Sequence, residues 1–147
     1  MSTVPKGARW RSDDGSVSLE MVILTPGLLL VIAVLVFGGR VALAGQSVEA
    51  AAGEAARVAS LARTQPEADG AAAAAAELSL SQQGLQCLST EVVVDTSGFA
   101  VPVGTAASIT ATVTCVVELS DLAAPGFPGS RTVTATAVSV LDTFRER

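Results

Sequence analysis

The chain has 147 residues, of which 50% are hydrophobic, and its formal net charge is −5. This length allows one membrane-spanning segment and one small domain, and the acidic balance excludes a general attraction to nucleic acid. The sequence contains no histidine and no tyrosine. Histidine-based catalysis is therefore excluded, and we expect no metal site, no cofactor and no small-molecule substrate.

Residues 1–15 form a polar leader, "MSTVPKGARWRSDDG", which carries Lys6, Arg9 and Arg11. We expect these cations to keep the amino terminus in the cytoplasm, so that the carboxy-terminal domain lies outside it.

An uncharged run follows at residues 21–39, "MVILTPGLLLVIAVLVFGG". At 1.5 Å per residue a helix of this length spans about 28 Å, which is close to the thickness of a bilayer core. A secretory signal peptide is the alternative, because "VALAG" at 41–45 offers the small residues of a cleavage site. Pro26 predicts a bend in the helix, with the hydroxyl of Thr25 nearby to satisfy a freed carbonyl.

The helical pattern continues beyond the apolar run, to Arg63. One apolar stripe is predicted on this part, and Glu54 and Arg57 form an i,i+3 pair on the polar side. The stripe consists of Val41, Ala44, Val48, Ala51, Ala55, Val58 and Ala62. Its side chains are mostly small, so the helix from about Ser16 to Arg63 needs a partner surface outside the membrane.

A second helix is predicted over residues 66–83. Thr64 and Glu67 have the spacing of a capping box at its start, and Gly84 is placed to end it. The alanine run within it has high helix propensity.

Strand patterns follow at residues 89–95, 108–119 and 131–142, which are rich in Val, Ile and Thr. In the second, Ile109 and every alternate residue to Leu119 share one apolar face, as in an antiparallel sheet with one wet side. Residues 120–130 hold two prolines and two glycines and are predicted to be a loop. The predicted fold class is α+β, with a long helix, a second helix and a small three-stranded antiparallel sheet.

Cys87 and Cys115 are the two cysteines of the chain. Neither belongs to a CxxC pair, which gives no support to a zinc or thioredoxin-like site. If this part of the chain lies outside the cell, a disulfide is the natural interpretation, and it would tie the first strand to the second. Two reduced, buried cysteines are the alternative.

A glycine and a glutamate mark the border of the apolar run. Gly15, "SVSLE" with Glu20 as its last residue, and an apolar helix together resemble a class III prepilin signal. The resemblance implies cleavage by a prepilin peptidase between Gly15 and Ser16. Ser16 would then carry a free α-amino group. In an assembled filament the Glu20 carboxylate would need a cation, which the amino terminus of a neighbour could supply. The alternative is an interfacial glutamate attracted by the helix dipole.

Residues 15–60 also resemble the TadE-like segment of tight-adherence (Tad/Flp) pilus proteins. The shared marks are the Gly15 to Glu20 border, Pro26, the exit from the membrane at Gly39-Arg40, and the small-residue stretch that ends in "EAARVAS". Major Flp pilins usually have tyrosine after the glutamate, whereas this chain has Met21. The resemblance therefore implies a minor pilin or pseudopilin that contacts the membrane, a prepilin peptidase and other pilins.

The domain organisation that follows is a leader at 1–15, a TadE-like helix at 16–63 and an extracytoplasmic α+β head at 64–147. An uncleaved single-pass protein, whose head serves as an adaptor in a secretion or pilus machine, is the second hypothesis. A secreted enzyme is not expected, because the head offers no nucleophile–base pair or paired carboxylates with suitable spacing. Asp95, Glu118 and Asp121 are interpreted as strand-edge and turn residues.

Overall fold

The computed structural model of the protein describes residues 14–120 and 129–144, with side chains from Met21 onward. Its elements are α1 (Asp14–Leu61), α2 (Gln65–Gln82), β1 (Cys87–Asp95), the 3-10 helix η1 (Ser97–Ala100), β2 (Ser108–Glu118) and β3 (Ser130–Val140). The predicted α+β class and order of elements are confirmed, with boundaries that differ by one or two residues. The chain divides into two units, residues 1–36 and 37–147, and the second unit contains the whole sheet.

The sheet has the strand order β1-β2-β3, and both neighbouring pairs are antiparallel. β2 therefore lies in the centre, and its residues alternate between buried and half-exposed along the strand. Ile109, Val113 and Cys115 are fully buried in the row that faces the helices. This is the alternation that the period-two pattern predicted, because successive side chains of a strand point to opposite faces.

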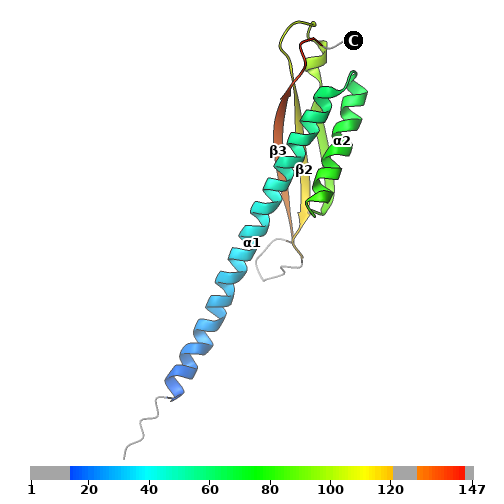
Figure 1. Ribbon diagram of the computed structural model, residues 1–147. Helices are drawn as coiled ribbons and strands as arrows, with labels where there is room; N and C mark the ends of the chain where they lie inside the picture. The colour runs from blue at the N-terminus through cyan, green and yellow to red at the C-terminus, as the bar shows by residue number, and fades with distance from the viewer. Residues whose placement is uncertain (1–13, 121–128, 145–147) are drawn as a thin grey trace, which may run out of the picture. The chain divides into compact units, whose positions relative to one another are not determined.

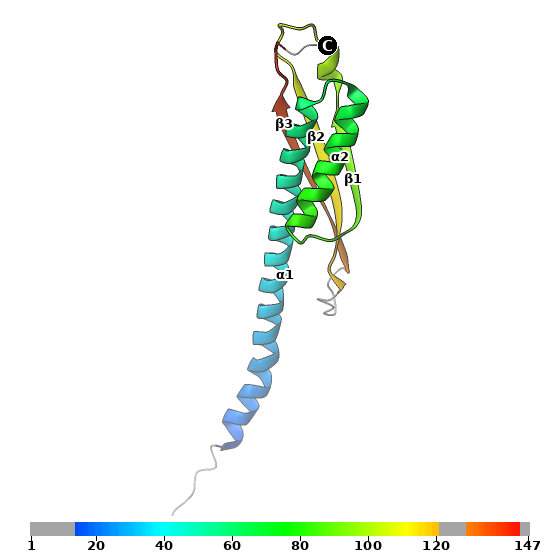
Figure 2. The ribbon, with the colours of Figure 1, turned by 45° about the vertical axis from the view of Figure 1, so that its right-hand side comes forward.

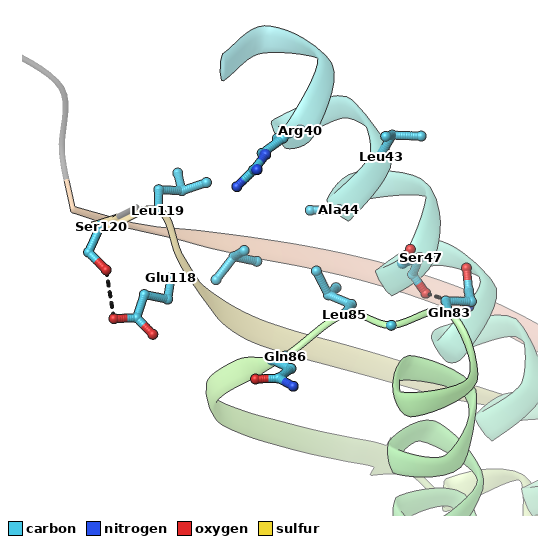
Figure 3. A pocket seen from close by; sticks show the side chains of 12 residues that line it. Arg40, Leu43, Ala44, Ser47, Gln83, Leu85, Gln86, Glu118, Leu119 and Ser120 are labelled. Carbon is cyan, nitrogen blue, oxygen red and sulfur yellow. Dashed lines mark hydrogen bonds between the residues drawn. The ribbon is translucent and has the colours of Figure 1, made fainter. Parts of the chain in front are cut away.

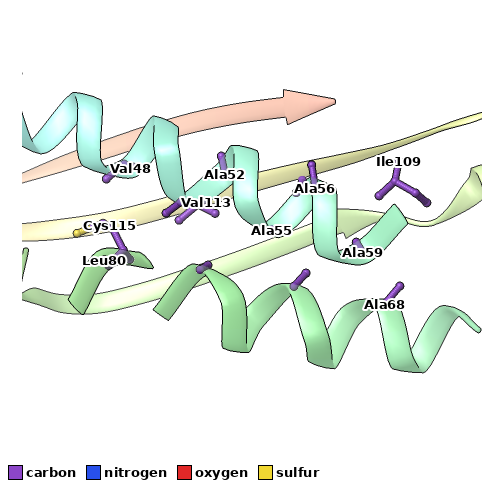
Figure 4. Close-up of a cluster of buried hydrophobic side chains, with 14 of the residues drawn as sticks. Val48, Ala52, Ala55, Ala56, Ala59, Ala68, Leu80, Ile109, Val113 and Cys115 are labelled. Atoms are coloured by element: carbon purple, nitrogen blue, oxygen red, sulfur yellow. The ribbon is translucent and has the colours of Figure 1, made fainter. Parts of the chain in front are cut away.

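Both helices cover the same face of the sheet within the unit 37–147 (Figure 1 and Figure 2). The hydrophobic core lies between them and the strands, and includes Leu80 of α2, Val113 of β2 and a row of alanines (Figure 4). Alanine is the main helical contribution to this core, so the helix backbones can approach the sheet and each other closely. Among the described residues, no helix covers the opposite face of the sheet.

The buried face of α1 is wider than the single stripe that the sequence predicted. Ala52, Ala56 and Ala59 are buried in addition to the predicted positions, whereas Val41 and Val58 of the predicted stripe are only half-buried. A stripe one residue wide would suit one partner, but α1 packs against both the sheet and α2. The expectation was too narrow because two surfaces meet this helix.

The carboxy-terminal end of α2 is closed as predicted by Gly84. This glycine has a φ of +69°, its N–H donates to the Ser81 carbonyl at 3.0 Å, and the Leu85 N–H donates to the Leu80 carbonyl at 3.0 Å. Together these are the two bonds of a Schellman motif, which requires a residue in the left-handed region.

The amino-terminal end of α2 differs from the predicted capping box. Thr64 is the N-cap residue, but its side chain makes no capping hydrogen bond. The Glu67 carboxylate does reach back, and it accepts from the backbone N–H of Arg63 at 3.1 Å instead of that of Thr64. The tight turn after α1 brings the Arg63 N–H within reach, so Glu67 connects this turn to the first turn of α2. Neither hydrogen bond of the predicted capping box is formed.

The end of the head away from the turn after α2 is closed by Gly98 and Leu141. A Cβ on Gly98 would lie 2.4 Å from the Ser108 carbonyl oxygen and 2.9 Å from a Leu141 methyl carbon. The Leu141 N–H donates to the Ala107 carbonyl at 2.9 Å, and the Leu141 side chain is buried. Only glycine fits this contact between η1, the start of β2 and the end of β3.

Candidate membrane and assembly segment

The apolar segment, residues 21–39, carries no charged side chain. Its large side chains from Met21 to Val36 are exposed on all sides, with Leu24 66% and Leu35 69% exposed, whereas Phe37 is half-buried against the core. Among the described residues, one helix is long and apolar enough to cross a membrane, and this segment is its most apolar part. A helix that is apolar all round needs an apolar environment, so the segment indicates association with a membrane.

Pro26 lies inside α1 without ending it. Because proline has no N–H, the carbonyl four residues earlier, that of Val22, receives no bond from it. The Thr25 hydroxyl donates to the Met21 carbonyl at 2.6 Å, one residue before the freed carbonyl. The Thr25 hydroxyl therefore bonds to a carbonyl near the proline, but that carbonyl is Met21's and not the freed one of Val22. The bend itself stays a prediction.

The predicted processing and assembly residues lie at the beginning of α1. The backbone of Gly15, Ser16 and Glu20 is helical, because α1 begins at Asp14. Their side chains, and residues 1–13 of the predicted leader, lie outside the described part of the chain. The roles given to Gly15, Ser16 and Glu20 therefore stay predictions.

Charged side chains reappear after the apolar segment, on the packed part of α1 (residues 40–61). Glu54 and Arg57 form the predicted ion pair, with Nη2 to Oε1 at 2.6 Å and Nε to Oε2 at 3.0 Å. The hydrogen bond from Arg57 lowers the pKa of the Glu54 carboxyl, and the same bond raises the pKa of Arg57. Both side chains are solvent-exposed, so the ion pair contributes little to the stability of the head.

A cavity of about 550 Å³ opens in the head where α1, the turn after α2 and the end of β2 meet (Figure 3). Arg40, the first charged residue after the apolar segment, extends from α1 toward the end of β2. Leu85 and Leu119 contribute apolar walls. The Gln83 side chain donates to the Ser47 carbonyl at 3.4 Å and ties the turn after α2 to α1. The lining mixes apolar and polar groups, and it includes the Ser120 hydroxyl, which donates to the Glu118 carboxylate at 2.8 Å.

The two cysteines form a disulfide between β1 and β2, with their Cα atoms 5.5 Å apart. Cys115 is fully buried on the helix side of β2. An irregularity in β1 between Cys87 and Ser89 shifts the register by one residue. Such a bulge re-aims the side chain before it, so Cys87 faces the same side of the sheet as Cys115. The disulfide interpretation is confirmed, and the bulge is the device that allows it.

Two acidic residues of the sheet make local hydrogen bonds. Asp95 ends β1, and its carboxylate accepts from the Ser97 N–H at 3.0 Å; this backbone bond lowers the pKa of Asp95. Glu118 ends β2 and accepts from the Ser120 hydroxyl at 2.8 Å. Both are turn and strand-end residues, as interpreted from the sequence, and Asp121 lies outside the described residues. Within residues 14–120 and 129–144, no group of three or more Cys, Asp or Glu side chains is placed to hold a metal ion.

Comparison with known families identifies the first part of the chain. The family model described as TadE-like protein matches residues 15–57. The chain carries a TadE-like segment. This segment begins at Gly15, contains the whole apolar segment and extends into the packed part of α1. No curated protein and no solved structure matches the chain.

The TadE-like segment supports involvement in Tad pilus assembly and a membrane context for the chain. It confirms the resemblance inferred from the Gly15 to Glu20 border, Pro26 and Gly39-Arg40, although the match ends at Arg57, three residues before the predicted limit. α2 and the sheet lie beyond the TadE-like segment, so their description depends on the structure alone.

Sequence reasoning missed two features of the head. The first is the additional buried row of Ala52, Ala56 and Ala59. Its i, i+4, i+7 spacing was a usable signal, but alanine also favours helix where the helix face is exposed. The second is the bulge before Ser89, for which the sequence contains no glycine or proline signal. Both features depend on the neighbouring element in the fold: the burial of the alanines depends on α2 and the sheet, and the bulge depends on the pairing of β1 with β2.

Proposed function

We propose that the chain is a minor pilin-like or pseudopilin-like structural component of a Tad/Flp pilus assembly system. A prepilin peptidase cleaves it after Gly15, the amino terminus stays on the cytoplasmic side and the head lies outside. The observation that carries the proposal is the TadE-like match, which begins at Gly15 and covers the exposed apolar segment. The protein acts by assembly with other pilins and pseudopilins and not as an enzyme.

The proposed assembly contact involves the new amino terminus at Ser16 and the carboxylate of Glu20. A charge in the bilayer core costs about 3 kcal/mol on insertion scales, and the cost falls toward the interface. A carboxylate that is buried between subunits needs a cationic partner, and the α-amino group of a neighbouring subunit is one. Pairing would set the axial register between subunits in the filament.

The oxidised head supports an extracytoplasmic location. The Cys87–Cys115 disulfide joins two strands of the sheet, and disulfides of this kind persist in oxidising compartments outside the cytoplasm. This agrees with an orientation in which the cations of residues 1–15 remain inside.

The amino-terminal residue of the protein purified from membranes tests the cleavage. In cells that contain the peptidase, we expect Ser16 at the amino terminus and an intact mass that lacks residues 1–15. Gly15→Leu should leave the chain at full length, whereas Gly7→Leu, a matched change within the leader, should be processed normally. A full-length wild-type chain would favour the uncleaved membrane adaptor instead.

The role of Glu20 is tested separately from the cleavage. Glu20→Ala should leave membrane insertion and processing intact and reduce the number of pili, while Glu49→Ala on the packed part of α1 should not. Normal piliation in the Glu20→Ala strain would remove the role given to this carboxylate.

A further inference from the structure

The cavity between α1, the turn after α2 and the end of β2 lies directly after the apolar segment. Phe37 and Val41 pack against the hydrophobic core of the head, and Arg40 lies between them in the sequence. The core therefore begins within the last turn of the apolar segment, with no linker between the segment and the head. Arg40 and Leu43 of this first packed turn line the cavity (Figure 3).

The length of the apolar segment sets the depth of the cavity in a bilayer. A helix from residue 21 to 39 spans about 28 Å and fills a hydrocarbon core of about 30 Å. The polar headgroups add about 5–8 Å on each side of that core. Arg40 is the next residue, and Ser47, which also lines the cavity, lies about 10 Å further along the helix. The cavity therefore extends from the level of the lipid phosphates to the edge of the water.

The lining of the cavity combines a cation with apolar walls. Arg40 supplies a guanidinium, whose planar fork of N–H donors matches the oxygens of a phosphate. Leu43, which is 64% exposed, and the side chains of Leu85 and Leu119 supply the apolar surface. The volume of about 550 Å³ is in the range of sites for small ligands. A ligand that suits this lining carries a phosphate next to apolar carbon.

The acid at the cavity is directed away from the cation. Glu118 accepts from the Ser120 hydroxyl at 2.8 Å, and Figure 3 shows its carboxylate turned toward Ser120 while Arg40 extends toward the end of β2. Glu118 is exposed, whereas its neighbours Val117 and Leu119 are buried. Because successive side chains of a strand point to opposite faces, Glu118 belongs to the face away from the helices. An anion beside Arg40 would therefore not meet this carboxylate on the same wall.

The turn after α2 forms a fixed polar wall. The Gln83 amide donates to the Ser47 carbonyl at 3.4 Å and to the Ser79 carbonyl at 3.3 Å, so it holds the turn against α1. Gly84 closes this turn with a φ of +69°. Gln86 follows with an exposed side chain on the lining, and its amide can donate to an ester or phosphate oxygen. A wall that is ordered before a ligand arrives lowers the cost of binding.

We propose that this cavity binds the phosphate of a membrane phospholipid, one per chain. The guanidinium of Arg40 holds the phosphate, and the glycerol and first acyl carbons lie against Leu43 and the other leucines. Free phosphate offers the same oxygens but no apolar carbon for these walls. The site requires that the apolar segment lies in a membrane. It depends neither on cleavage after Gly15 nor on entry into a pilus.

Native mass spectrometry of the full-length protein in mild detergent tests the ligand. The probes are phosphatidylglycerol and a diacylglycerol with the same acyl chains, which lacks the phosphate. The protein should retain one phosphatidylglycerol per chain and about tenfold less diacylglycerol, because the contact with a charged donor is lost. Excess inorganic phosphate should not displace the lipid. Equal retention of the two lipids, or displacement by inorganic phosphate, would overturn the proposal.

Variants of Arg40 test whether the lipid lies in the cavity. Arg40→Gln should reduce the single-lipid adduct about tenfold. Arg40→Lys keeps the charge but not the planar fork, and should retain more lipid than Arg40→Gln. Arg63→Gln removes the same charge at an exposed position after the end of α1 and should bind lipid as the wild type does. Equal loss in Arg40→Gln and Arg63→Gln, or loss in neither, would contradict a site at Arg40.

The position of the cavity is tested without a change at Arg40. Gln86→Cys on the lining and Gln65→Cys at the opposite end of α2 each carry a fluorophore, with the native disulfide intact. The full-length protein is reconstituted in phosphatidylcholine vesicles that contain lipids with spin-labelled headgroups. Emission should be quenched several-fold more at position 86 than at position 65, and equal quenching would overturn the placement. The Gly15→Leu chain should give the same pattern, so a failure of cleavage does not affect this test.

Discussion

The apolar segment and the packed part of α1 belong to one helix, but they are stabilised by different surroundings. The apolar segment carries large side chains, such as Leu24 and Leu35, that are exposed on all sides. The packed part carries mainly alanine on its buried face and lies against a sheet in which a disulfide joins β1 to β2. Bulky residues serve a helix that meets lipid, whereas small residues serve one that must approach other backbones closely. The four predictions below test this difference, from the largest effect to the smallest.

The disulfide should matter most, and only for the head. Cys87 and Cys115 are 28 residues apart, and closing a loop of this length contributes roughly 3–4 kcal/mol in the chain-entropy model. The double change Cys87→Ala/Cys115→Ala should lower the free energy of unfolding by about this amount, measured by urea unfolding of the full chain in detergent. Reduction of the wild-type protein should have the same effect. The membrane-bound fraction should not change in either case. Unchanged stability of the double variant and of the reduced protein would show that the hydrophobic core alone is enough to stabilise the head.

A charge in the apolar segment should affect membrane association and not the head. Leu30→Arg places a cation near the middle of the segment, where insertion scales give about 2.5–3.5 kcal/mol of cost. The carbonate-resistant membrane fraction should fall, while the disulfide still forms in protein that is inserted. Leu30→Ala is the control and should insert normally. Equal insertion of the two variants would contradict a membrane-spanning role for residues 21–39.

Enlarging one alanine should separate the two parts of α1. Ala52 is fully buried, so Ala52→Leu should overpack the core and cost about 1–3 kcal/mol of stability. Ala33→Leu makes the same change in the apolar segment, at a residue outside the core of the described part of the chain, and should leave the head's unfolding midpoint unchanged. Urea unfolding followed by circular dichroism measures both. Equal effects of the two changes would mean that the packed part of α1 is not close-packed.

The smallest effect is expected from the ion pair on the outer surface of α1. The hydrogen bond from Arg57 lowers the pKa of the Glu54 carboxyl in the folded protein. The ion pair therefore stabilises the fold fully above the carboxyl's unfolded pKa, and this stabilisation is lost as the pH falls through the lower, folded pKa. Glu54→Gln should therefore lower the Tm slightly at neutral pH, and the difference from wild type should vanish in acid. Glu77→Gln on α2 is the control. A difference that grows in acid would contradict the assignment.

The sequence alone was sufficient for the order of elements, the buried face of β2, the carboxy-terminal end of α2 and the extent of the apolar segment. Each depends on a local rule: the period of two from Ile109 to Leu119, the need for a left-handed residue at Gly84, and the absence of charge from residue 21 to 39. The Gly15 to Glu20 border, with Pro26 behind it, was also enough to identify the TadE-like segment, because it is a linear pattern.

Only the tertiary structure decided which alanines are buried, how Cys87 reaches Cys115, and where the Glu67 carboxylate binds. Alanine has almost the same local preference on either face of a helix, so the burial of Ala52 and Ala56 depends on α2 and the sheet that lie across from them. The bulge before Ser89 is likewise a property of two strands paired together. The open face of the sheet follows from the same cause, because both helices pack on the more apolar side, which carries Ile109, Val113 and Cys115.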